Sequence, residues 1–78
     1  MRNPLEDPRD GDVIQPVARL EFIKLQPHEV LGRAGRVVFY RIGIGGFGNV
    51  EMCPLDQWCG DPGIIRWDIV QRGEGPDA

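Results

Sequence analysis

The chain has few of the residues on which metal sites and covalent catalysis depend. Its 78 residues include one histidine, His28, and two cysteines, Cys53 and Cys59, with five residues between them. Zinc usually takes four ligands in close pairs such as Cys-x2-Cys, and a nucleophilic cysteine needs a histidine beside it. Because His28 follows Pro27 in an expected loop, we expect no metal, no cofactor and no catalytic residue. We therefore expect that the protein is not an enzyme.

Long apolar runs are missing as well. No stretch approaches the ~20 residues that a membrane-spanning helix needs. Met1 and Arg2 are followed by Asn3 and Pro4 rather than by the apolar stretch of a signal peptide. We expect a cytoplasmic protein that makes no contact with a membrane, and in that compartment both cysteines are expected to be free thiols.

Positive charge is in short supply. The chain has 9 Lys and Arg against 12 Asp and Glu, a formal net charge of −3. Nucleic-acid-binding proteins usually carry a basic stripe, because neutralising phosphates supplies much of their affinity. Here the basic residues are densest at Arg33, Arg36 and Arg41, while acidic residues gather toward both ends. We do not expect nucleic acid as the partner; a host protein with a basic surface would be complementary to the acidic ends.

No segment repeats its apolar residues with a helical period over three turns. Apolar and polar residues instead alternate with the period of two that is typical of strands. The 11 Gly and 7 Pro supply many turns between short strands. We expect strands at Val17–Leu25, Arg36–Ile44, Asn49–Cys53 and Ile64–Gln71, a turn at Leu31–Gly35, and a 3-10 turn at Pro54–Trp58.

These elements predict an all-β fold. We expect a small SH3-like barrel or a two-layer β-roll of four or five short strands with one 3-10 turn, because closure would protect the strand edges. We place a single domain at residues 12–72, between an extended N-terminal arm at residues 1–11 and a flexible tail at residues 73–78. The alternation predicts three inward side chains, those of Val50, Met52 and Trp67.

Gly43 to Gly48 match the dinucleotide fingerprint Gly-x-Gly-x-x-Gly and, with the next two residues, the glycine-rich loop of protein kinases. The fingerprint requires a helix after its last glycine, but the residues that follow are strand-like and end at Pro54. Kinase chemistry requires a later lysine, and none follows Lys24. We interpret the motif as a tight hairpin turn. The alternative that its backbone N–H groups hold the phosphate of a nucleotide signal stays open.

Phe47 stands among four glycines, where no strand packing requires an aromatic ring. Large aromatic residues on loops are frequent interface anchors, and charged residues form the rims of interfaces. A partner would meet one patch if the hairpin tip and the 3-10 turn lie at the same end of the domain. The predicted partner-binding residues are Gly45, Gly46, Phe47, Asp56, Trp58 and Asp61.

Three segments resemble sequences of small phage and prophage proteins. Asp7-Pro8-Arg9-Asp10-Gly11-Asp12-Val13 is similar to their opening Asp-Pro-Arg-Pro-Gly-Asp-Val, with Asp10 in place of the second proline. Val38-Phe39-Tyr40-Arg41 and Cys53-Pro54-Leu55-Asp56-Gln57-Trp58 follow in the order of their Val-x-Tyr-Arg and Cys-x-Leu-x-x-Trp segments. The resemblance covers about two thirds of the chain. It implies an origin on a mobile element and carries no activity with it.

We therefore expect a non-enzymatic interaction protein of a phage or other mobile element, one that binds and blocks, or adapts, a host protein complex. A nucleic-acid-directed defence complex is the sharpest version of this hypothesis, since an acidic domain can occupy a basic groove. Two alternatives stay open. One is an SH3-like nucleic-acid-binding module that uses the three arginines, and the other is a nucleotide-signal-binding protein that uses the glycine-rich hairpin.

Overall fold

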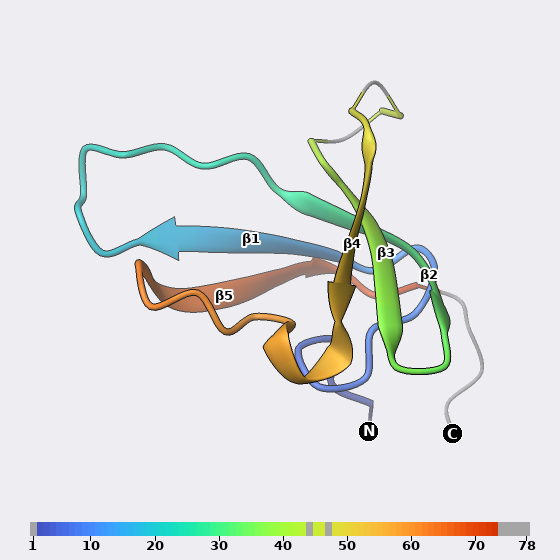
Figure 1. The fold of residues 1–78 in the computed structure, drawn as a ribbon. Helices are drawn as coiled ribbons and strands as arrows, with labels where there is room; N and C mark the ends of the chain where they lie inside the picture. Colours follow the sequence, from blue (N-terminus) through green and yellow to red (C-terminus); the bar gives the residue numbers. More distant parts are fainter. Residues whose placement is uncertain (1, 44, 47, 74–78) are drawn as a thin grey trace.

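Five antiparallel strands and one short 3-10 helix make up the regular structure of the computed structural model (Figure 1). It describes residues 2–43, 45–46 and 48–73. No helix within these ranges is long and apolar enough to cross a membrane. The expected all-β class with one 3-10 turn is confirmed. The elements are β1 (Val13–Ala18), β2 (His28–Ala34), β3 (Val37–Ile42), β4 (Val50–Pro54), η1 (Leu55–Gln57) and β5 (Ile64–Gln71).

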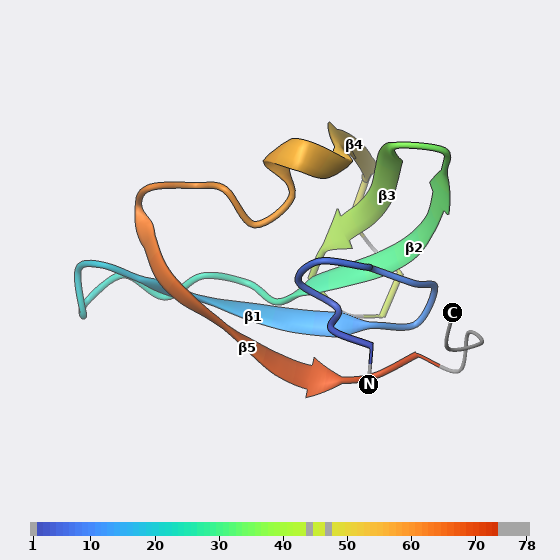
Figure 2. The ribbon, with the colours of Figure 1, turned by 90° about the horizontal axis from the view of Figure 1, so that it is seen from below.

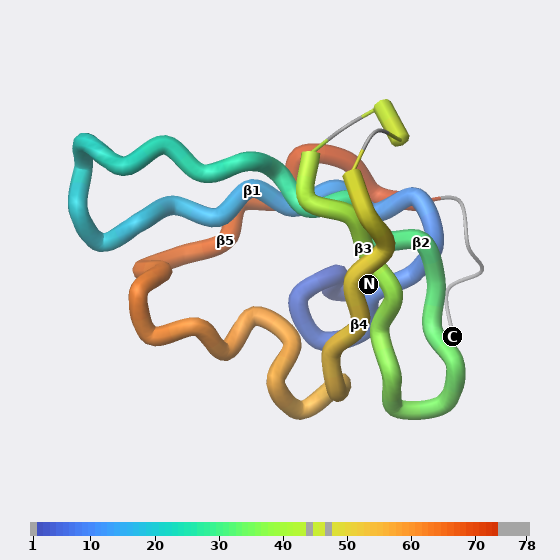
Figure 3. Tube along the Cα trace, turned by 45° about the horizontal axis from the view of Figure 1, so that its top comes forward, coloured from blue at the N-terminus to red at the C-terminus, as the bar shows by residue number. Residues whose placement is uncertain are grey.

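The strands form one sheet in the order β4-β3-β2-β1-β5. After the β2-β3-β4 meander, the chain passes through η1 and residues 58–63 and then pairs β5 with β1 (Figure 3). β4 and β5 are the two outer strands, so the sheet is not closed into a barrel. We call the gap in pairing between β4 and β5, which residues 55–63 span, the open seam.

The position of the first strand differs from the expectation. β5 matches the expected strand at both ends, and β3, β4 and η1 lie within two residues of theirs. The prediction of a strand at Val17–Leu25 is wrong. The strand β1 occupies Val13–Ala18 instead, and it pairs with β5 along its length. Residues 19–27 form a connecting loop instead.

The turn expected at Leu31–Gly35 is also wrong. β2 continues to Ala34 and pairs with β3, with an irregularity in register between Val30 and Gly32. The chain reverses only at Gly35 and Arg36, and Gly35 has the left-handed φ of 59° that a two-residue hairpin turn favours.

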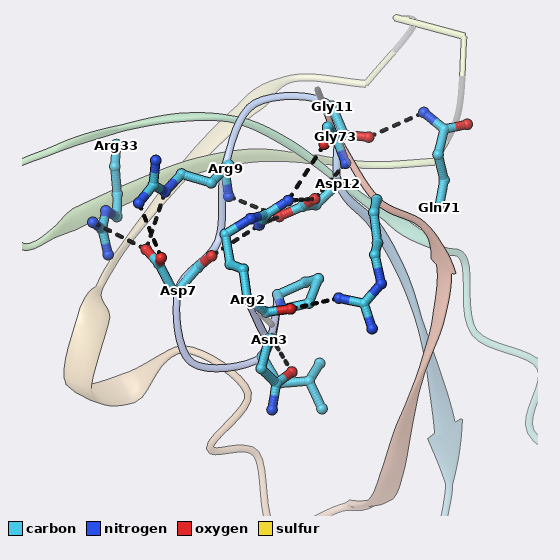
Figure 4. A network of polar contacts seen from close by, with 12 residues as sticks. Arg2, Asn3, Asp7, Arg9, Gly11, Asp12, Arg33, Gln71 and Gly73 are labelled. Atoms are coloured by element: carbon cyan, nitrogen blue, oxygen red, sulfur yellow. Dashed lines mark hydrogen bonds and ion pairs between the residues drawn. The ribbon is translucent and has the colours of Figure 1, made fainter. Parts of the chain in front are cut away.

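Residues 2–12 fold back onto the sheet, where the sequence predicts an extended arm (Figures 1 and 2). Pro4 and Pro8 are fully buried. The carboxylate of Asp12 is also buried, and it accepts hydrogen bonds from the Arg2 guanidinium, the Arg9 N–H and the Gly73 N–H (Figure 4). This network ties the N-terminal segment, the start of β1 and the end of β5 together.

The core contains one tryptophan, and it is not the expected one. Trp58 packs with the buried side chains of Ile14, Val30 and Val38, whereas Trp67 is only partly buried beside them. Trp58 follows η1, and the N-terminal segment covers it.

Val50 and Met52 were expected to face inward and are instead exposed on the outer face of β4. Side chains along a strand alternate between its two faces, and on β4 it is Cys53 that packs against the core. Its neighbour Met52 therefore points outward, as does Val50 two residues earlier.

Candidate functional site: an aromatic cleft

A cleft with a volume of about 180 Å³ lies at the open seam. Strands β2, β3, β4 and β5 each contribute to its wall, and η1 with the residues after it contributes the rest. We call it the aromatic cleft. Its wall consists of His28, Tyr40, Cys53, Gln57, Trp58, Cys59, Gly60, Asp61, Ile64 and Trp67.

Four rings of this wall contact one another in a continuous row. The imidazole of His28 stacks on Tyr40 with ring centroids 5.3 Å apart, and it meets Trp67 edge-on at 5.1 Å. Tyr40 meets Trp58 edge-on at 5.2 Å. Aromatic quadrupoles favour these offset and edge-to-face arrangements, so the row Trp58–Tyr40–His28–Trp67 is a mutually supported wall.

The register of the sheet explains why these rings meet. His28 lies opposite Ile14 of β1, and Trp67 lies opposite Pro16, two residues further along the same strand. Residues two apart share a face of a strand, so His28 and Trp67 emerge on the same side of β1. Tyr40 joins them because it pairs with Val30, two residues after His28.

The wall of the aromatic cleft has a carboxylate and no Lys or Arg. Asp61 lines it, and the Oδ1 atom of Asp61 accepts a hydrogen bond from the Gly63 N–H at 2.8 Å. Burial raises the pKa of Tyr40, and the nearby Cys53 and Glu51 raise it further. The charge of Glu51 is therefore close to the cleft. Burial lowers the pKa of His28 from its ordinary value of 6.5, so the imidazole is uncharged at neutral pH.

Both cysteines contribute neutral thiols to the wall. Burial, and then the charge of Asp56, raises the pKa of Cys53, while burial raises the pKa of Cys59 to about 12. Because the thiolate is the nucleophile and the metal ligand, these protonated thiols are poor at both kinds of chemistry. Across the described ranges, no group of three or more His, Cys, Asp or Glu side chains could hold a metal ion.

The indole of Trp67 has an unused hydrogen-bond donor. Its Nε1 atom is buried and has no hydrogen-bond partner among the described residues. A buried donor left unpaired costs about 1–3 kcal/mol.

The structure does not bring the predicted partner-binding residues together. Gly45 and Gly46 lie in the connection from β3 to β4, whereas Asp56 and Asp61 lie on and after η1, beyond the other end of β4 (Figure 1). The length of β4 separates the two groups. Phe47 lies outside the described residues.

The side chain of Trp58 packs in the core and also forms part of the wall of the cleft. It is 8% exposed, and its Nε1–H donates a hydrogen bond to the Pro4 carbonyl oxygen. Asp56 and Asp61 are exposed, and Asp61 lines the same cleft. Of the predicted residues that the structure describes, Trp58 and Asp61 line the aromatic cleft, and Gly45, Gly46 and Asp56 do not.

His28 and Tyr40 were not predicted from the sequence to be members of a common wall. His28 was expected to be solvated in a loop, but it begins β2 and is half-buried. The alternation in β3 correctly put Tyr40 on the same face as the core residue Val38. The alternation in β3 therefore indicated the face on which Tyr40 lies. It did not indicate which residues of other strands would lie against that face.

The glycine-rich segment is a connection between antiparallel strands, as interpreted from the sequence. β3 and β4 pair on either side of it, and the element that follows Gly48 is the strand β4, not the helix that the fingerprint requires. Gly43, Gly45 and Gly46 have left-handed φ angles of 102°, 98° and 79°. A Cβ atom at Gly48 would lie 2.7 Å from the Ile42 carbonyl oxygen, so a glycine is required there on packing grounds alone.

The three arginines are spread along the β2-β3 hairpin, from the end of β2 to the end of β3. Arg36 precedes β3, and Arg41 lies near its other end. Arg33 is paired with Asp7, its Nη2 atom 3.2 Å from the carboxylate oxygen. A phosphate-binding stripe would need these guanidinium groups side by side.

A larger hollow, about 390 Å³ in volume, lies between the loop at residues 19–27 and strands β1 and β5. Its wall has no aromatic ring and mixes Arg19, Lys24 and Arg66 with Glu21. Binding sites usually combine convergent polar groups with apolar or aromatic walls. The smaller aromatic cleft fits that description better, and we take it as the candidate site.

Comparisons of the chain with protein-family models, with curated proteins and with solved structures found no match.

Proposed function

We propose that this protein is a non-enzymatic interaction domain that receives a side chain of a partner protein in the aromatic cleft. The observation that carries the proposal is the row of four contacting rings at the open seam. Aromatic residues around a recess are typical of the centre of a protein interface, where a few anchors supply most of the binding energy.

The size of the aromatic cleft supports a side chain as its occupant. Pockets that bury a drug-sized ligand or cofactor have volumes of about 300–1,000 Å³. The aromatic cleft, at about 180 Å³, is smaller than this range. A single long side chain from a partner fits the space, while the surrounding exposed residues of η1 and β5 are available to its backbone.

The phage resemblance extends the proposal to the partner. On that basis the domain binds a host protein inside the host cell and blocks or adapts it. The acidic side chains near the cleft favour a partner with a basic surface, because complementary charge increases association rates and specificity.

Photo-crosslinking from the cleft tests this function. A benzophenone amino acid replaces Gln57, which is exposed and lines the cleft, in cells that naturally carry the protein. The control places the same group at Glu21, an exposed loop residue that does not line the cleft. We expect one protein to be crosslinked from position 57 and not from position 21. If the partner were crosslinked from position 21 and not from position 57, the docking surface would lie elsewhere.

A further inference from the structure

We infer that the side chain received by the aromatic cleft is a cation, a lysine or arginine of the partner protein. This inference rests on the proposed function and adds the chemistry of the ligand to it. Two features of the cleft support it: its rings and the charge around it.

The rings supply the first argument. Trp and Tyr faces attract ammonium and guanidinium groups through the ring quadrupole when the cation lies within about 6 Å of the ring centre. Trp58, Tyr40 and Trp67 all line the cleft, and neighbouring rings in the row are 5.1–5.3 Å apart. A cation in this space therefore lies within reach of more than one ring.

Charge around the cleft supplies the second argument. Asp61 lines it, and Glu51 and Asp56 are close enough to act electrostatically on Tyr40 and Cys53. The wall contains no Lys or Arg to oppose them. A neutral apolar side chain would gain nothing from these carboxylates, whereas a cation is attracted by all three.

Nuclear magnetic resonance titration of the intact protein tests the inference. The probes are N-acetyl-lysine amide and N-acetyl-norleucine amide, which share the backbone and an aliphatic stem but differ in the ammonium group. The indole N–H signals of Trp58 and Trp67 report on the cleft. We expect lysine amide to shift the Trp67 signal saturably and to bind about three- to fivefold more tightly than norleucine amide.

The matched variants are Asp61→Asn and Glu21→Gln. The asparagine side chain in D61N keeps an oxygen that can accept the Gly63 N–H, so the substitution removes charge without removing the turn. We expect D61N to weaken the lysine probe about two- to fivefold and E21Q to leave it unchanged. The comparison of the two probes on the unaltered protein stands even if D61N fails to fold.

The outcomes separate this inference from the proposed function. Equal binding of lysine and norleucine probes would overturn the inference and leave the cleft as an apolar docking site. Binding of neither probe would also overturn it, while the crosslinking from position 57 decides the proposed function on its own.

Discussion

The indole N–H of Trp58 donates a 3.1 Å hydrogen bond to the carbonyl oxygen of Pro4, 54 positions earlier in the chain. The bond is buried, and it joins the N-terminal segment to the residue that follows η1. Trp58 also meets Tyr40 in the aromatic row. The N-terminal segment therefore supports the ring at one end of the cleft wall, so the fold and the candidate site depend on the same contact.

Replacing Trp58 with Ala should destabilise the domain more than replacing Trp67 with Ala. A fully packed tryptophan typically costs about 3–5 kcal/mol when truncated, and a half-buried ring about 1–2 kcal/mol. A domain of this size has only about 3–5 kcal/mol of net stability, so urea unfolding should be measured in a sucrose buffer that strengthens burial. A larger loss for W67A would mean that Trp67 is the principal core ring.

Removing the carboxylate of Asp12 should unfold the domain. Asp12 and Arg2 form an ion pair with side-chain exposures of 0% and 5%, and the Arg9 and Gly73 N–H groups donate to the same carboxylate. Breaking one partner of a buried pair costs about 3–5 kcal/mol, because the remaining charge stays buried without compensation. We expect D12A to lose its cooperative thermal transition in circular dichroism.

The control for this variant is Asp10→Ala, which removes an exposed carboxylate two positions earlier. Such a surface change should alter the free energy of unfolding by less than about 0.5 kcal/mol. If D10A and D12A melt alike, the network around Asp12 does not contribute to stability as its burial implies.

Local patterns predicted the strands β3, β4 and β5, and they failed for β1 and β2. β3, β4 and β5 alternate cleanly, and Pro54 correctly marks the start of η1. Residues 19–25 alternate just as well, but they pair with no strand in the described structure, because β1 reaches its β5 partner earlier, at residues 13–18. Alternation identifies a segment that is able to pair; it does not say where the pairing partner ends.

The candidate site was less predictable than the fold, for a related reason. Trp58 was chosen as a surface anchor from its place after a turn, and nothing local showed that Pro4 would cover it. His28 looked solvated beside Pro27, yet the pairing of β1 with both β2 and β5 sets it against Trp67. Contacts between residues 12 to 39 positions apart created the row of rings in the cleft, and a period of two contains no information about them.

Stability should decrease as the pH falls below about 6.5, through His28. Burial lowers the pKa of His28 in the folded protein relative to its ordinary value of 6.5. The unfolded chain therefore binds the proton first on acidification, and stability is greatest above pH 6.5 and decreases as the pH falls from that value toward the folded pKa. One proton limits the slope to about 1.4 kcal/mol for each pH unit.

Urea unfolding between about pH 7.5 and pH 5 measures this loss, with His28→Phe as the control because it keeps a ring beside Tyr40 and Trp67 and cannot titrate. We expect the wild type to lose stability in this window and H28F to lose much less.

Asp7 and Asp12 do not obscure the comparison. The hydrogen bond from Arg9 lowers the pKa of Asp7; burial would raise the pKa of Asp12, but bonds from Arg2, Gly73 and Arg9 outweigh it. Both carboxylates therefore titrate below 3.8, outside the window. A protonated His28 also places a positive charge in the aromatic cleft, so the lysine probe should bind more weakly to the wild type, but not to H28F, as the pH falls through the lowered pKa of His28 in the folded protein. Equal losses of stability in both proteins would show that another group titrates in this window and that His28 is not the source of the pH dependence.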